Sequence, residues 1–183
     1  MDSRLEVVVI MPWIKALAEE VRRRKKHGKQ QILSAENELN GGEIMIHNAT
    51  KAIEQVFHDA DLKYTVREIE KVSFLEAGLA SHQGIQSPIR FLSSDDDNDV
   101  AVRISPLVRV PEDKTGEILK LINGYHSRYR YIRFCLDSDN DLIAGYDLAV
   151  KAENIGETAL EIFIRFSQIL DDVYPEIMRV IWS

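Results

Sequence analysis

The spacing of apolar residues changes along this chain, and that change constrains the fold more than any other feature. Over residues 44–60, Ala49, Ile53, Val56 and Phe57 recur at helical spacing and mark one face of an amphipathic helix. The apolar residues then alternate with polar ones in the runs 62–66, 72–80, 87–93 and 100–110. Alternation is typical of a strand with one buried face. The sequence therefore predicts a helix followed by antiparallel strands.

The second half of the chain repeats this change of period. Pro111 suits the first turn of a helix, and its buried face is expected at Ile118, Leu119, Ile122 and Tyr125. Two strands over residues 131–136 and 142–150 follow, and a long amphipathic helix closes the chain. Because the helices are too few for alternating βαβ units, we expect an α+β fold in which an antiparallel sheet packs against helices.

Residues 1–42 are predicted to form a helical extension that precedes the main domain. Pro12 begins a helical pattern that contains Trp13, Leu17 and Val21 and ends in a basic run over residues 22–26. The pair Gly41-Gly42 then breaks the chain. We place the main domain at residues 43–183.

Composition favours a folded protein of the cytoplasm. The chain has 183 residues, of which 45% are hydrophobic and 29% charged, with a net charge of −7. This charge disfavours attraction to nucleic acids and anionic lipids. The sequence has no signal-peptide pattern and no apolar run of the roughly 20 residues that a membrane helix needs. The single cysteine, Cys135, lies in an apolar run and is expected to be a packed thiol.

The second half also resembles a known family. The resemblance rests on a helix ending in Leu121-Ile122-Asn123, a strand near residues 132–134, the turn entry Leu136-Asp137, the strand end Tyr146-Asp147-Leu148 and a long closing helix. These features resemble the YbjN family of proposed bacterial sensory transduction regulators, over roughly residues 44–182. The resemblance implies a fold like that of type III secretion chaperones and a dimeric or partner-binding module. It implies no catalytic residues. Gly124-Tyr125-His126 departs from the family pattern.

Metal sites are weakly supported by the sequence. Asp137, Asp139 and Asp141 match the first three ligand positions of a calcium loop, as do three aspartates of the run 95–99. Both runs lack the glycine and glutamate that complete such a loop. We therefore interpret them as turns, with weak cation binding at residues 95–99 as the alternative. The five histidines show no zinc-ligand spacing. We expect His58 and His126 to lie near the C-terminal ends of helices, where a side chain that can carry positive charge is favoured by the helix dipole.

We expect no catalytic site and no cofactor. The sequence contains neither the elbow motif of a nucleophilic serine nor a glycine-rich phosphate loop. An enzyme built from dispersed residues remains an alternative. A second alternative is nucleic-acid binding by residues 128–134, in which arginines and aromatic residues alternate on a predicted strand.

The function predicted is therefore that of a non-catalytic protein-binding or chaperone-like regulatory module. The partner is expected to be a client segment or a second copy of the chain, because sheet edges and exposed apolar side chains favour such pairing. The candidate surface comprises the strand pair over residues 131–150 and the final helix. Its predicted contact residues are Tyr131, Arg133, Tyr146, Phe163 and Phe166.

Overall fold

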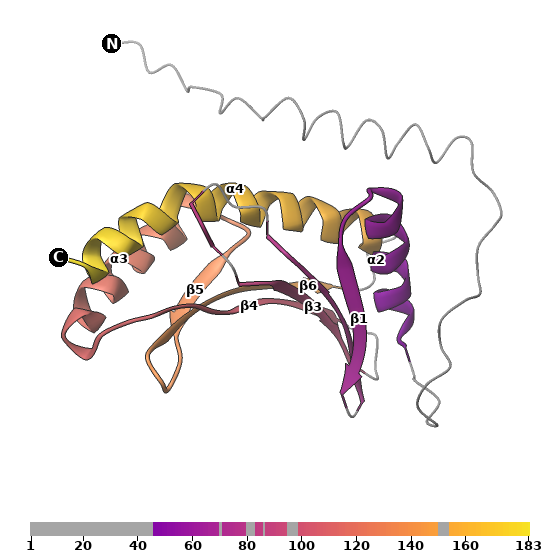
Figure 1. Cartoon of the computed structure of the whole chain (residues 1–183), viewed down its shortest axis with the longest axis horizontal. Helices are drawn as coiled ribbons and strands as arrows, with labels where there is room; N and C mark the ends of the chain where they lie inside the picture. The colour runs from indigo at the N-terminus through magenta and orange to yellow at the C-terminus, as the bar shows by residue number, and fades with distance from the viewer. Residues whose placement is uncertain (1–45, 70, 80–82, 86, 95–98, 150–153) are drawn as a thin grey trace, which may run out of the picture. The chain divides into compact units, whose positions relative to one another are not determined.

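The computed structural model describes residues 46–69, 71–79, 83–85, 87–94, 99–149 and 154–183. The predicted helical extension over residues 1–42 and its boundary at Gly41-Gly42 lie outside these residues. The described part of the chain is coloured in Figure 1.

The order of elements confirms the α+β class. Helices and strands follow one another as α2 (Asn48–Asp59), β1 (Tyr64–Ile69), β2 (Val72–Ala77), β3 (Ile89–Ser93), β4 (Asp99–Arg109), the 3₁₀ turn η1 (Glu112–Lys114), α3 (Thr115–Arg128), β5 (Arg133–Leu136), β6 (Asp141–Ala149) and α4 (Ile155–Ile181). The strand predicted at residues 131–136 begins only at Arg133, where pairing with β6 starts opposite Gly145. The other predicted elements occur with shifts of a few residues at their ends.

The strands form one antiparallel six-stranded sheet in the order β1-β2-β3-β4-β6-β5. Cross-strand partners run in register from β2 to β6, as in the row Leu75, Phe91, Val102 and Tyr146. The pairing of β4 with β6 is interrupted after Ile104 and resumes at Val108. β5 and β1 therefore form the two edges of the sheet.

Alternation along the strands separates a covered face from an open face. The covered face is apolar and fully buried at central positions such as Leu75, Phe91 and Val102. Charged pairs occur on the other face, where the Arg90 Nε lies 2.7 Å from Glu76 Oε2. Figure 1 shows α4 running along the covered face, with α2 near one of its ends. The helices α2 and α4 thus lie on the apolar face of the sheet.

A buried hydroxyl cluster fixes α2 over the sheet. The hydroxyl oxygens of Thr50 on α2 and Ser73 on β2 lie 2.8 Å apart, and Thr50 also donates to Ser93 Oγ of β3 at 3.0 Å. All three side chains are fully buried. Each polar atom has a partner, so burial carries no unmet hydrogen-bonding cost. The cluster sets the position of α2 along β2 and β3.

In the first turn of α4, the backbone at Gly156 packs directly against the backbone of α2. A Cβ atom placed on Gly156 would lie 2.4 Å from the Ala52 carbonyl oxygen and 2.7 Å from Val56 Cγ2. No side chain larger than hydrogen fits there without movement of α2 or α4. Gly156 therefore permits the close approach of the two helices.

The buried face of α3 is narrower than the sequence predicts. Ile118, Ile122 and Tyr125 are buried as expected, at positions four and three residues apart. Leu119 was predicted to join them, but it is 47% exposed, so that prediction is wrong. The helical turn rotates Leu119 away from the face that its neighbours share.

Tyr125 joins α3 to α4. Its hydroxyl donates to Glu176 Oε2 at 2.9 Å, and its ring packs against Phe134 with centroids 5.7 Å apart. Burial raises the pKa of the Tyr125 hydroxyl far above its ordinary value, and the hydrogen bond and charge of Glu176 raise it further. The folded protein thus holds this phenol in its neutral form.

Replacing Gly156 tests the contact between α2 and α4. We expect Gly156→Ala to lower the free energy of unfolding by about 1–3 kcal/mol, because overpacking forces the backbone apart. The matched control is Gly124→Ala in α3, where a Cβ would meet nothing within 4 Å. That change should leave stability equal or raise it by about 0.5–1 kcal/mol. Urea denaturation measures both, and equal stabilities of Gly156→Ala and wild type would contradict the contact.

Alkaline pH tests the Tyr125 junction. Because the pKa of Tyr125 is raised in the fold, its stabilising contribution is present below pH ~10 and is lost as pH rises further, when the unfolded chain ionises first. Tyr125→Phe should lower stability at pH 7 by about 1 kcal/mol. It should also reduce the decline in stability above pH ~10, measured by urea denaturation across pH. Parallel curves for variant and wild type would contradict the assignment.

Candidate partner-binding surface

Two of the predicted contact residues lie together at the surface. Tyr131, 37% exposed, and Tyr146 of β6 pack edge to face, with ring centroids 6.1 Å apart. The Arg165 guanidinium of α4 lies 4.6 Å from the centre of the Tyr131 ring. A cation over an aromatic face is a favourable contact that also restrains both side chains. The three residues come from separate parts of the chain, so the fold must form before they meet.

A surface hollow continues from this cluster. Its volume is about 280 Å³. The polar and aromatic residues that line the hollow are Arg128, Tyr129, Arg130, Tyr131, Arg165 and Gln168. We call these six residues the arginine–tyrosine surface. The end of α3 and the segment that leads into β5 supply one wall, and α4 supplies the other.

Two further contacts order this surface. Arg128 lies over the Tyr129 ring, with its guanidinium carbon 5.1 Å from the ring centre. Arg165 forms an ion pair with Glu161 one turn earlier on α4. Burial raises the pKa of Tyr129; Arg128 lowers it, and the Asp172 and Glu176 carboxylates raise it. The net shift is upward, so this hydroxyl is neutral at physiological pH.

Arg133 faces the opposite side of the sheet. Its strand neighbour Phe134 is buried on the covered face, so alternation directs Arg133 to the open face, where it is exposed. Its cross-strand partner there is Gly145, and Arg103 lies across that glycine and pairs with Asp147 at 2.6 Å. Arg133 therefore does not share one contact surface with Tyr131.

Phe163 and Phe166 belong to the core. Phe166 is fully buried and Phe163 is 7% exposed, and the Phe163 ring packs edge to face on Phe57 of α2 at 5.5 Å between centroids. The prediction that these two residues contact a partner does not fit this burial. Their helical spacing identified the inner face of α4, and the outer face carries the exposed side chains.

The segment 128–134 is not the strand that a nucleic-acid platform would need. Arg128 ends α3, and β5 begins only at Arg133. Within the segment, Ile132 and Phe134 are buried, while Arg128 and Arg130 are exposed. The strand on which arginines and aromatic residues were predicted to alternate therefore does not form over residues 128–132.

Cys135 and His126 lie at the β5 edge. Cys135 was predicted to be packed, but it is exposed, because its neighbour Phe134 takes the buried position of the alternating strand. The His126 ring accepts a hydrogen bond from the Phe134 backbone N–H through Nε2 at 2.9 Å. This contact joins the end of α3 to the edge strand, beside an open hollow of about 310 Å³.

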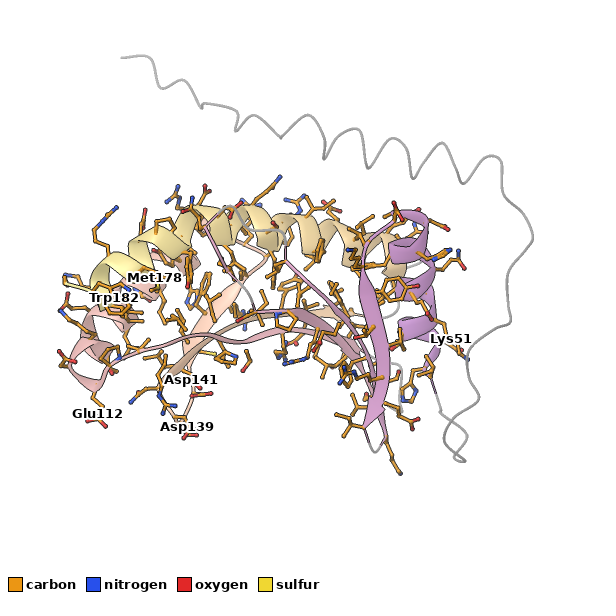
Figure 2. All side chains as sticks on the ribbon, in the orientation of Figure 1. Lys51, Glu112, Asp139, Asp141, Met178 and Trp182 are labelled. Carbon is orange, nitrogen blue, oxygen red and sulfur yellow. The ribbon has the colours of Figure 1, made fainter. Side chains whose placement is uncertain are left out.

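The acidic turn between β5 and β6 stabilises its own backbone. One Asp137 oxygen, Oδ1, accepts hydrogen bonds from the amides of Asp139 and Asp141, each at 2.9 Å. Asn140 adopts the left-handed conformation with φ of 59°. Figure 2 shows Asp139 and Asp141 at this turn. Residues 95–98 of the second acidic run lie outside the described part of the chain.

The described residues contain neither a cluster of metal ligands nor a helix that could span a membrane. No group of three or more His, Cys, Asp and Glu side chains is placed there to hold a metal ion. Across the same part of the chain, none of the helices combines the length and apolarity required to span a bilayer.

The sequence prediction included the final helix in the surface but missed the two α4 residues that line it, Arg165 and Gln168. Arg165 and Gln168 lie on the flank of a helix whose apolar face dominates its pattern. The spacing of Glu161 and Arg165, four residues apart, was the available signal of an ordered arginine. Spacing along one helix does not indicate which residues of other elements it contacts, so the contact between Arg165 and Tyr131 could not be predicted.

Comparison with known proteins adds the family. No curated protein and no solved structure matches the chain, so the likeness to type III secretion chaperones remains a prediction. The family model YbjN, described as "Putative bacterial sensory transduction regulator", matches residues 50–178. This match begins within α2 and ends within α4, and it includes the whole sheet, α3 and the arginine–tyrosine surface. The chain belongs to the YbjN family.

Proposed function

We propose that this protein is a non-catalytic regulatory module that binds another protein through the arginine–tyrosine surface. The observation that carries the proposal is the exposed Tyr131 ring, held between Tyr146 and Arg165. Membership of a family of regulators agrees with such a role.

The composition of the surface supports protein recognition. Tyrosine and arginine are the side chains most enriched at the energetic centres of protein interfaces, because each combines apolar contact area with a polar end. Here two tyrosine rings and three guanidinium groups line one hollow. The ring contacts of Arg128 and Arg165 restrain these long side chains before binding, which lowers the entropy lost in a complex.

Two residues that the sequence singled out for possible chemistry, Asp137 and His126, have structural roles, which supports a non-catalytic module. The carboxylate of Asp137 holds its turn, and His126 holds the edge strand. The two hollows have volumes of about 310 and 280 Å³, close to the lower limit of typical small-molecule sites, roughly 300 Å³. A side chain of a protein partner is of suitable size for either.

The proposal also covers the cellular location, the regulatory role and the kind of partner. We place the protein in the bacterial cytoplasm, in sensory or stress regulation, with residues 1–42 as a helical extension of the 43–183 domain. The partner is a client segment or a second copy of the chain. The open edge of β5 offers additional backbone groups for pairing.

Site-specific photo-cross-linking in bacterial cells tests this function. We expect Tyr131→p-benzoylphenylalanine to form a discrete cross-linked product, because a bound partner lies over the ring. A product of twice the 21.0 kDa chain mass identifies a homodimer, and another discrete mass identifies a different protein. The control is Ile69→p-benzoylphenylalanine, since Ile69 is 62% exposed at the end of β1.

Truncation of the Tyr131 side chain tests how much this residue contributes to the affinity for the partner. Tyr131→Ala should weaken binding of the captured partner by about tenfold or more, as expected for an aromatic centre of an interface. Calorimetry with the purified partner measures this change, and Ile69→Ala should have no effect. Absence of a discrete product at position 131, or equal products at positions 131 and 69, would contradict the proposal.

A further inference from the structure

The arginine–tyrosine surface concentrates positive charge at one point of an acidic protein. Arg128 and Arg130 come from the end of α3 and the residues after it, and Arg165 comes from α4, yet all three line the same hollow of about 280 Å³. The whole chain carries a net charge of −7. A local group of arginines in such a chain marks where an anion would be attracted against the mean field.

The three arginines differ in how far their charge is already neutralised. Arg165 pairs with Glu161. Arg128 and Arg130 form no ion pair with another described residue, and both are exposed. Arg128 is held over the Tyr129 ring, which leaves its N–H groups able to donate at the ring edge. Two guanidinium groups are therefore available to an incoming anion.

Nearby carboxylates limit which anion fits. The Asp172 carboxylate lies close enough to Tyr129 to raise the pKa of its hydroxyl, and Glu161 lies beside Arg165. A group with two negative charges would be repelled by both carboxylates. A singly charged group would gain the arginine contacts at lower cost, and a carboxylate matches the planar fork of a guanidinium in two parallel hydrogen bonds.

The size of the hollow limits the source of that carboxylate. A volume of about 280 Å³ is at the small end of sites that enclose a cofactor or a free metabolite, roughly 300–1,000 Å³, and it is large enough for one side chain. A nucleic acid would need phosphate contacts spread along a groove, whereas these cations gather at one place. The observations favour an aspartate or glutamate side chain that a partner protein inserts.

We infer that the hollow between Arg128, Arg130 and Arg165 binds a carboxylate side chain from an acidic segment of the partner protein. The inference rests on the proposed function and specifies the chemistry of the partner. The tyrosine rings supply the apolar contacts beside the acidic side chain, and the arginines supply the charge-assisted hydrogen bonds.

Fluorescence anisotropy of the full chain with short labelled peptides tests the inference. The probe is a peptide of alternating glutamate and glycine, and we expect binding at low salt that weakens as salt is added. The double variant Arg128→Gln/Arg130→Gln should weaken binding about tenfold or more. The matched control is Arg67→Gln/Arg179→Gln, which removes the same charge from exposed positions on β1 and α4 outside the hollow's lining. It should bind like the wild type.

Four outcomes would overturn the inference. These are absence of binding by the glutamate peptide, equal weakening in the two double variants, tighter binding of a phosphoserine peptide of the same frame, and tighter binding of single-stranded DNA. Equal weakening in the two double variants would mean that the peptide responds to the net charge of the protein and not to these arginines. If the peptide fails while the photo-cross-linker at position 131 still captures a protein, the carboxylate inference fails and the proposed function stands.

Discussion

Packing of α4 against the sheet is the interaction on which the rest of the structure depends. The helix runs from Ile155 to Ile181 and lies along the covered face of the sheet (Figure 1). Its inner side chains are buried, among them Leu160, Phe163, Phe166, Leu170, Val173 and Ile177. Each such side chain contributes about 1.5–3 kcal/mol when removed from water. Without this helix the apolar face of the sheet would be exposed, and α2 and α3 would lose the element that joins them.

The same helix determines where the candidate surface lies. Close packing at Gly156 fixes one end of α4 against α2, and the Tyr125 hydroxyl fixes the other end to α3 through Glu176. Arg165, which lies over Tyr131, is on the part of α4 between these two contacts. The surface is therefore formed by the end of α3, the segment that leads into β5, and α4. Rigid support of this kind keeps aromatic and guanidinium groups in place without a partner.

The periodicity of the sequence predicted the α+β class and the order of the described elements, because burial on one face imposes a period on every amphipathic segment. Individual exposures were less predictable. Leu119 and Cys135 lie next to buried residues in apolar runs, and only the packed structure shows that they face outward. Phe163 and Phe166 were assigned to the surface although their helical spacing already marked the core. The meeting of Tyr131 with Arg165 depends on tertiary packing, which a period cannot encode.

Hydrogen–deuterium exchange of the full chain, alone and in complex with its cross-linked partner, tests the central claim most directly. Binding at the arginine–tyrosine surface should slow exchange in residues 128–132 and in the α4 turns around Arg165 and Gln168. Exchange in the core strands β3 and β4 should stay unchanged, since the scaffold is already formed. New protection confined to the open face of the sheet or to β1, with none around Tyr131 and Arg165, would contradict the account.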